Sequence, residues 1–212
     1  MSSSIYHISI CRKQPDGNYK KFGSIEYMCK GKTVDILMLF INDVAERGKG
    51  YGYGLILLSL CNIIKTYPGA YNITKIKLDD DSDGAFTINS IYYKLGFRIF
   101  HGDEVMEIKF LKPPLSKRMK SKLFIYEDEG HTEPYPVYYK TILDLYENTI
   151  SNRKYNQIIS GIIGEVESES LKFTINNNIT DEPKDLDISE CLNIKPEIEA
   201  NMHDLRRKRT RS

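Results

Sequence analysis

The sequence has few cysteines, and their spacing forms no familiar framework. The four cysteines, Cys11, Cys29, Cys61 and Cys191, include no C-x-x-C pair. They provide no zinc-binding or disulfide scaffold, and the four histidines are isolated from one another, so we expect no metal site. The N-terminal residues MSSSIYHIS contain no basic segment followed by an apolar one. We therefore expect an intracellular, cytoplasmic protein in a reducing compartment.

The sequence also lacks a long apolar run and an excess of either charge. Its longest apolar run, residues 55–64, is interrupted by Ser59 and Asn62 and falls far short of the roughly 20 residues that a membrane span needs. With 30 Lys and Arg residues against 29 Asp and Glu, the net charge of +1 gives no overall attraction to nucleic acid or to a membrane. Nucleic-acid contact would depend on the basic C-terminal cluster RRKRTR at 206–211. That cluster is also typical of a nuclear-import signal or of a merely solvated chain end.

The hydrophobic pattern predicts an α/β fold. Residues 34–41 (VDILMLFI) form a nearly continuous apolar run, typical of a central strand covered on both faces. Helical spacing occurs in residues 54–66 and 84–95, with Asp83 as the expected cap of the second helix and Gly96 as its end. The other predicted strands are residues 5–11, 19–28, 73–78 and 105–111.

Composition divides the chain into three parts. Residues 1–112 carry the α/β pattern, and the Pro113–Pro114 pair marks a boundary. Residues 113–165 are expected to form a partly helical appendage, with a strand candidate at 123–126 and helical spacing at 137–146 and 155–163. Residues 166–212 are polar, first acidic and then basic, and predict a flexible tail.

A glycine-rich turn stands between the strand at 34–41 and the helix at 54–66. Glycines at 48, 50, 52 and 54 allow the backbone to expose N–H groups to one side, and the helix N-terminus adds partial positive charge. A phosphate or pyrophosphate is the natural occupant. The turn matches neither a Walker A loop nor a dinucleotide G-x-G-x-x-G motif, and what remains is R-x-x-G-x-G at 47–52.

This motif resembles the coenzyme A loop of the GCN5-related N-acetyltransferase superfamily, [Q/R]-x-x-G-x-[G/A]. The sequence YYKLGF at 92–97 resembles the second signature of that superfamily, a helix that ends Tyr-x-x-x-Gly-Phe before a strand. The resemblance covers roughly residues 5–111. It implies a mixed, mostly antiparallel sheet flanked by helices, with acetyl-CoA as the acyl donor and CoA as the product.

The resemblance also implies roles for particular residues. The backbone near Phe40 and Ile41 would hold the pantetheine arm and polarise the thioester carbonyl. Tyr92 would protonate the departing thiolate, because a phenol of pKa near 10 is slightly weaker as an acid than a thiol; packing in the core is the other interpretation of this side chain. The residues expected to hold the pyrophosphate are Arg47, Gly48, Lys49, Gly50, Tyr51, Gly52 and Tyr53.

Two departures from the family pattern bear on the site. Ala85 stands where the family often has an asparagine, so the cofactor contact of that residue would be lost or taken over by Asn89. The usual helix pair between the first two strands is missing, because only residues 12–19 separate them. We expect the appendage after Pro114 to supply the wall of the acceptor site instead.

Carboxylates follow the strand at 73–78. The segment 79–84 (DDDSDG) imitates the start of an EF-hand, but Ser90 stands where a bidentate glutamate is needed. These carboxylates would attract a cationic amine, and Asp79 is the candidate general base. Glu46 is an alternative base, although a solvated loop charge is the simpler interpretation.

The sequence therefore predicts an acetyl-CoA-dependent N-acyltransferase. An acetyl group would pass to a primary amine, either a small molecule or a protein, by direct attack in a ternary complex. The alternative is a non-catalytic binding module of the same fold, which would engage protein or nucleic acid through its C-terminal extension.

Overall fold

The computed structural model describes residues 5–79, 90–99, 105–110, 127–128, 131–132, 139, 142–178 and 181–189. The elements in chain order are β1 (Ile5–Lys13), β2 (Tyr19–Lys30), β3 (Thr33–Ile41), η1 (Val44–Glu46), α1 (Tyr51–Thr66), η2 (Ala70–Asn72), β4 (Lys75–Leu78), α2 (Ile91–Leu95), β5 (Arg98–Ile99), β6 (Met106–Lys109), β7 (Glu127–Asp128), β8 (His131–Thr132), α4 (Ile142–Ser151), α5 (Arg153–Glu167), β9 (Leu171–Asn176) and β10 (Lys184–Leu186).

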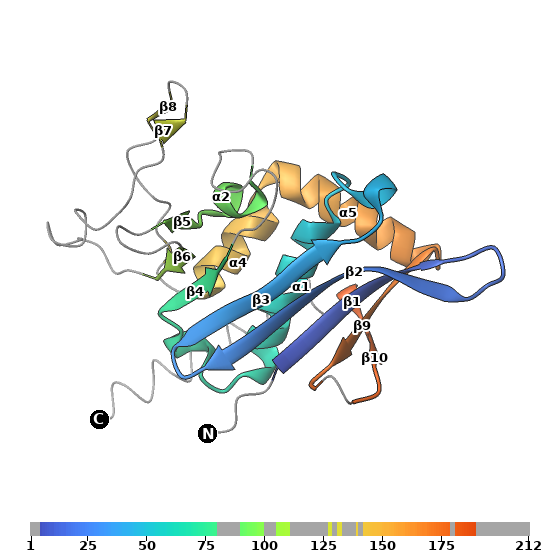
Figure 1. The fold of residues 1–212 in the computed structure, drawn as a ribbon, viewed down its shortest axis with the longest axis horizontal. Helices are drawn as coiled ribbons and strands as arrows, with labels where there is room; N and C mark the ends of the chain where they lie inside the picture. Colours follow the sequence, from blue (N-terminus) through green and yellow to red (C-terminus); the bar gives the residue numbers. More distant parts are fainter. Residues whose placement is uncertain are drawn as a thin grey trace, which may run out of the picture.

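A single large sheet organises these elements (Figure 1). Its eight strands follow the order β10-β9-β1-β2-β3-β4-β6-β5. Every pair is antiparallel except β3 and β4, which run parallel because α1 connects them. The predicted fold class, a mixed and mostly antiparallel sheet with flanking helices, is confirmed.

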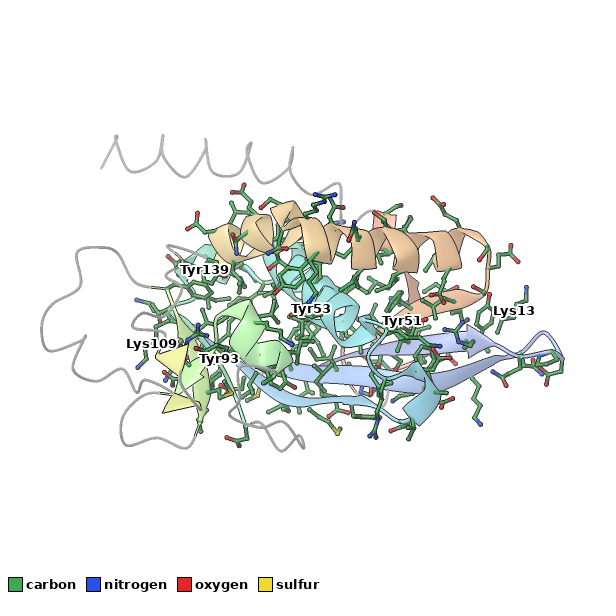
Figure 2. All side chains as sticks on the ribbon, turned by 90° about the horizontal axis from the view of Figure 1, so that it is seen from above. Lys13, Tyr51, Tyr53, Tyr93, Lys109 and Tyr139 are labelled. Atoms are coloured by element: carbon green, nitrogen blue, oxygen red, sulfur yellow. The ribbon has the colours of Figure 1, made fainter. Side chains whose placement is uncertain are left out.

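Helix α1 lies between two layers, with the sheet on one side and α4 and α5 on the other (Figure 2). This position explains why the helix is apolar around most of its circumference. Even its polar residues Ser59 and Asn62 are buried. Ser59 Oγ donates to the carbonyl of Ile56 at 2.7 Å, and Asn62 Nδ2 donates to the Tyr27 hydroxyl at 2.7 Å, so neither polar group is left unsatisfied.

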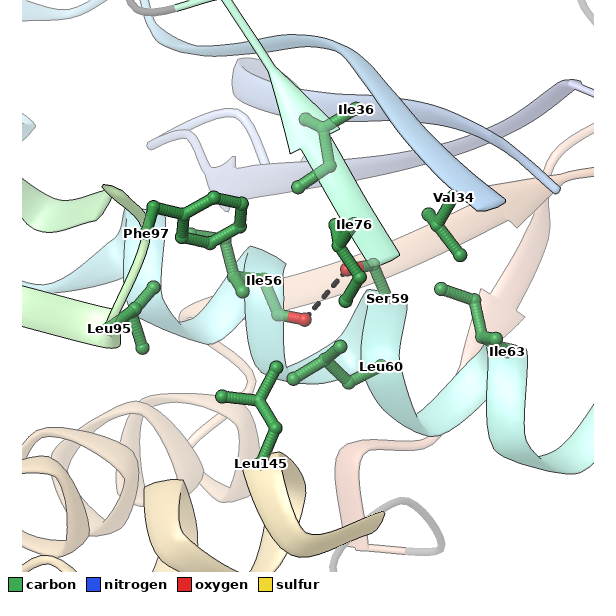
Figure 3. Close-up of a pocket in the computed structure, with 10 residues that line it drawn as sticks. All are labelled: Val34, Ile36, Ile56, Ser59, Leu60, Ile63, Ile76, Leu95, Phe97 and Leu145. Carbon is green, nitrogen blue, oxygen red and sulfur yellow. Dashed lines mark hydrogen bonds between the residues drawn. The ribbon is translucent and has the colours of Figure 1, made fainter. Parts of the chain in front are cut away.

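A small gap lies in the interior beneath the sheet (Figure 3). Its free volume of about 10 Å³ is at the lower limit for one water molecule. This gap is part of the core packing and is too small for a ligand. It is lined by Val34, Ile36, Ile56, Ser59, Leu60, Ile63, Ile76, Leu95, Phe97 and Leu145.

Helix boundaries differ from the expected ones in two places. Helix α1 begins at Tyr51, three residues before the expected start, because Gly50 adopts the left-handed conformation that ends the preceding turn. Helix α2 is described from Ile91, and its cap is Ser90, whose hydroxyl accepts from the Tyr92 N–H at 3.2 Å. The expected cap at Asp83 and the strand candidate at 123–126 lie outside the described residues.

The prediction that residues 34–41 are covered on both faces is wrong. Leu37 is 49% exposed and Met38 is 42% exposed. The described helices α1, α4 and α5 all lie on one face of the sheet, so the β3 side chains that point to the other face are not packed beneath them (Figure 2). We call this second side the open face.

Residues 171–186 contribute two strands to the sheet, although their composition predicts flexible chain. Strand β9 pairs with β1 over six residues, from His7↔Asn176 to Arg12↔Leu171, and β10 pairs with β9. The buried side chains of Leu171 and Phe173 join the main core. The division at residues 112 and 165 stays a prediction, and the basic cluster at 206–211 lies outside the described residues.

Candidate functional site

The glycine turn before α1 has the backbone geometry of an anion site. Gly48 and Gly50 have φ values of 77° and 92°, in the left-handed region that favours glycine. Gly50 caps α1 without a side-chain hydrogen bond, and its carbonyl accepts from the N–H groups of Tyr53 and Gly54 at 3.0 and 3.2 Å. The N–H groups at the very start of the helix are thus free of side-chain capping among the described residues, as a bound anion requires.

The glycines of this turn serve different purposes. A Cβ at Gly48 would meet nothing within 4 Å, so only its backbone conformation requires glycine. A Cβ at Gly50 would clash with Ile158 of α5, so this glycine also permits close packing. A Cβ at Gly52 would lie 3.2 Å from Ile91 Cδ1, which shows that the start of α2 approaches the turn.

Strand β3 has a free edge beside this turn. Its pairing with β4 ends at Asp35↔Lys77, yet β3 continues to Ile41, and no other described strand pairs with residues 36–41 on that side. The pairing with β2 also shifts register between Glu26↔Met38 and Tyr27↔Ile36, which leaves Leu37 as a bulge. The two central strands therefore separate at the end of the sheet where α1 begins.

The alternation of the β2–β3 ladder shows which β3 groups face the free edge. The Asn42 N–H donates to the Phe22 carbonyl at 2.7 Å, so Phe40 also directs its backbone groups to β2, while Leu39 and Ile41 direct theirs to the free edge. Arg47 Nε donates to the Ile41 carbonyl at 3.0 Å and fixes the turn to this strand. The sequence does not point to Leu39, because the bulge that sets the alternation cannot be read from the sequence.

Helix α2 ends as the sequence predicts. Gly96 has φ 102°, its N–H bonds to the Tyr93 carbonyl, and the Phe97 N–H bonds to the Tyr92 carbonyl, both at 3.0 Å, which forms a Schellman motif. Tyr92 is 8% exposed, and its ring packs edge-on against Phe97 at 5.8 Å. The contact between Ile91 and the Gly52 position brings the start of this helix to the free edge of β3.

The remaining predicted site residues have different surroundings. Asp79 is exposed directly after β4. Asn89 lies outside the described residues. The Tyr53 hydroxyl donates to the Tyr155 hydroxyl, which donates to the Lys94 carbonyl, each at 3.1 Å. The Tyr53 side chain therefore joins α1 to α5 and α2, and only its backbone is available to a ligand.

The view of Glu46 as a solvated loop charge is wrong. Glu46 is 8% exposed, and its carboxylate pairs with Arg12 Nε at 2.9 Å and with Lys49 Nζ at 3.1 Å. Arg12 also donates to Glu165 of α5 at 3.0 Å, and the Tyr51 hydroxyl donates to the same carboxylate at 2.8 Å. This cluster of paired charges holds the turn against β1 and α5. The Glu46 carboxylate is therefore a structural ion-pair partner.

Tyr51 carries a testable consequence of this cluster. The pKa of Tyr51 is raised to about 12, above the value near 10 of an unfolded tyrosine. Burial of the hydroxyl is the larger cause, and the hydrogen bond to Glu165 is the second. The folded state therefore holds this proton more tightly, and the resulting stabilisation is complete below pH 10 and is lost as the pH rises toward 12. We expect the stability advantage of the wild type over Tyr51→Phe to shrink between pH 10 and 12 in urea unfolding. An advantage that stays constant over this range would contradict the assignment.

Other classes of site are not evident in the described part of the chain. Within it, no group of three or more His, Cys, Asp or Glu side chains could hold a metal ion. No described helix is long and apolar enough to cross a membrane. Cys11, Cys29 and Cys61 are buried free thiols, and burial raises the pKa of Cys29 to about 12, which disfavours the nucleophilic thiolate.

A hollow of about 350 Å³ adjoins the turn at the end of the β1–β2 hairpin. Basic and acidic groups stand on its walls, and it opens beside the segment that connects β3 to the turn. Its lining residues are Arg12, Gln14, Lys20, Lys21, Phe22, Asn42, Asp43 and Glu46.

Comparison with known proteins gives partial matches only. No protein-family model and no curated protein matches the chain. Among solved structures, PaiA N-acetyltransferase from Thermoplasma acidophilum, in complex with coenzyme A, is 23% identical over 49% of this chain and 61% of its own, with a TM-score of 0.35. The chain thus spans less than two thirds of that protein.

Two further solved structures are similar to the chain. The match to an acetyltransferase from Bacillus cereus is 24% identical and covers 50% of this chain and 74% of the Bacillus chain, with a TM-score of 0.35. The match to Tetrahymena GCN5 is 17% identical and covers 61% of this chain and 70% of the GCN5 chain, with a TM-score of 0.31. The order of strands and helices, the separation of β3 from β4 and the glycine turn before α1 identify the fold of this chain as that of the GCN5-related N-acetyltransferases.

Proposed function

We propose that this chain is an acetyl-CoA-dependent N-acyltransferase that acetylates a primary amine. The observation that carries the proposal is the free edge of β3 beside the uncapped N-terminus of α1. The free edge offers hydrogen-bonding groups to an extended, amide-containing chain, and the helix N-terminus offers N–H groups to a pyrophosphate. Coenzyme A contains both of these parts, because its pantetheine arm is an extended chain with amide groups and is joined to a pyrophosphate at one end.

The residues present fit this ligand. Residues 47–52 would bind the pyrophosphate through backbone N–H groups, and Gly48 leaves open space where any other residue would place a Cβ. Leu39 and Ile41 would hold the pantetheine amides along the free edge. The bound cofactor supplies an activated acetyl thioester, and the chain contributes alignment of the amine with that group. Tyr92 is proposed to donate a proton to the departing sulfur.

The acceptor amine would approach from the open face. On the helix side, Ile91 and Leu39 already pack close to Gly52, so little room remains there. Asp79 lies in an exposed position at the end of β4, where its carboxylate would attract a cationic amine. A protein residue or a small molecule would both meet the chemical requirement of a primary amine.

Titration calorimetry with acetyl-CoA, followed by thiol release in the presence of an amine panel, tests the proposal. We expect wild-type protein to bind acetyl-CoA and to release thiol only when an amine is present. The Gly52→Val variant is expected to lose binding, because the added side chain fills the space between the turn, Ile91 and Leu39.

The matched control for this experiment is Gly161→Val in α5. Gly161 is also a helical glycine, and a Cβ there would meet nothing within 4 Å, so the control makes the same change of residue away from the turn. Equal binding by Gly52→Val and Gly161→Val would contradict the placement of the cofactor. Binding by the wild type without thiol release from any amine would instead favour the binding-module alternative.

A further inference from the structure

The open face of the sheet carries a histidine whose two ring nitrogens have opposite partners. His7 Nδ1 lies 2.8 Å from a carboxylate oxygen of Glu26, on the neighbouring strand β2. His7 Nε2 lies 2.9 Å from Lys21 Nζ and 2.8 Å from Ser9 Oγ. A carboxylate only accepts and an ammonium only donates, so the proton is on Nδ1 and the lone pair is on Nε2. His7 is thereby held with a basic nitrogen directed at an ammonium group.

Lys21 defines a position for a cation on this face. Besides its contact with His7, its ammonium lies 5.6 Å from the centre of the Phe40 ring, within the range of a cation–π contact. Phe40 belongs to β3, the strand with the free edge, and the residues on either side of it direct their backbone groups to that edge. The cation position therefore borders the strand along which the acetyl thioester is proposed to lie.

We propose that the ammonium of Lys21 occupies the place of the acceptor amine, and that His7, oriented by Glu26, removes the proton of that amine. The inference rests on the proposed acyltransferase function. Lys21 is exposed and carries a flexible four-carbon side chain, so an incoming amine can displace it. The acceptor class is a primary alkyl ammonium with an unbranched carbon next to nitrogen, like the lysine side chain that the site already accommodates.

The proton and electron balance of the step is simple. The acceptor ammonium gives one proton to His7 Nε2, and the resulting neutral amine attacks the carbonyl carbon. A C–N bond forms as the C–S bond breaks, the Tyr92 hydroxyl gives its proton to the departing sulfur, and the second N–H proton restores that hydroxyl. The imidazolium then returns its proton to solvent. The charged groups that face His7 among the described residues are Glu26 and Lys21, and the β9 residue opposite it, Asn176, is neutral.

Substitution of Lys21 by Met tests the proposal without touching the imidazole. The change removes the internal competitor, and we expect the KM for n-butylamine to fall about fivefold, the scale of one partly exposed charged contact. Lys20→Met is the matched control, because Lys20 is an exposed lysine one position earlier on β2, beside Arg12 in the pairing of β1 and β2. The His7→Gln variant is expected to lower kcat/KM for the amine by about 100-fold.

A binding measurement separates this inference from the proposed function. In the Lys21→Met protein without cofactor, n-butylamine is expected to shift the imidazole NMR signals of His7, assigned by their loss in His7→Gln, at lower concentration than in Lys20→Met. An equal response of the two lysine variants, or no response in either, would overturn the ammonium site. A response confined to Lys21→Met, with no thiol release from any variant, would support the site and overturn the acyltransferase.

Discussion

The Gly50→Ala variant is expected to lose more stability than Gly48→Ala by about 1–3 kcal/mol. Both glycines have positive φ, so a Cβ at either position carries a left-handed strain of about 1–2 kcal/mol. Only at Gly50 would the Cβ also clash with Ile158 of α5, which adds the cost of overpacking, typically about 1–3 kcal/mol. The two variants differ in the packing term alone.

Urea unfolding of both variants measures this difference. A double-mutant cycle with Ile158→Ala isolates the contact, because shortening Ile158 removes the atoms that the new Cβ would meet. The double variant Gly50→Ala/Ile158→Ala is therefore expected to be more stable than the sum of the single effects implies. Equal losses at positions 48 and 50, with no coupling to Ile158, would show that α5 does not pack on the turn as the structure describes.

This contact explains why the glycine motif could be read only in part from the sequence. The pattern G-x-G-x-G-x-G before an apolar helix correctly predicts a turn with left-handed residues. It gives no sign that Gly50 and Gly54 also face Ile158 and Ile162, because those residues lie far along the chain in α5. Small residues four apart at the start of α1 face branched residues four apart on α5, so these glycines permit close packing of the two helices.

The first strands and helices could be predicted because their signals are local. The alternation in β1 and β2 and the LGF end of α2 each depend on residues close in sequence. Strand β9 could not be predicted in this way. Its stability comes from pairing with β1, and its neighbours in sequence are polar residues typical of flexible chain.

The site was predicted least well where long-range contacts decide a role. Glu46 looks like an exposed loop charge in the sequence, yet Arg12 and Lys49 enclose it. His7 looks like an isolated strand histidine, but the register of β1 and β2 places Glu26 and Lys21 at its two nitrogens. The alternation along β1 and β2 could have placed these residues on one face of the sheet. It could not have predicted the register of the two strands, which decides which side chains are neighbours.

Replacement of Tyr92 by Phe is expected to lower kcat by about 100-fold while leaving the affinity for acetyl-CoA unchanged. The substitution keeps the ring, which packs against Phe97, and removes only the hydroxyl. If that hydroxyl protonates the departing sulfur, its loss affects the transition state and not the bound ground state. Thiol release and calorimetry on the same sample measure the two quantities.

The matched control is Tyr93→Phe, the next residue of α2. Tyr93 is as buried as Tyr92, at 7% and 8% exposure, and its ring lies 3.7 Å from the Arg98 guanidinium, a contact that Phe preserves. A similar fall of kcat in both variants would indicate a disturbance of α2 and contradict the assigned role. A selective fall in Tyr92→Phe would identify the hydroxyl.

The pH dependence of the Tyr92→Phe defect provides an independent check. A thiol has a pKa near 8.5, so below that pH the departing sulfur ends protonated, and above it the sulfur ends as a free thiolate. The wild-type advantage should therefore narrow as the pH rises above about 8.5, where protonation of the sulfur contributes less to the reaction. An advantage that stays constant across this range would indicate that Tyr92 positions the substrate and does not transfer the proton.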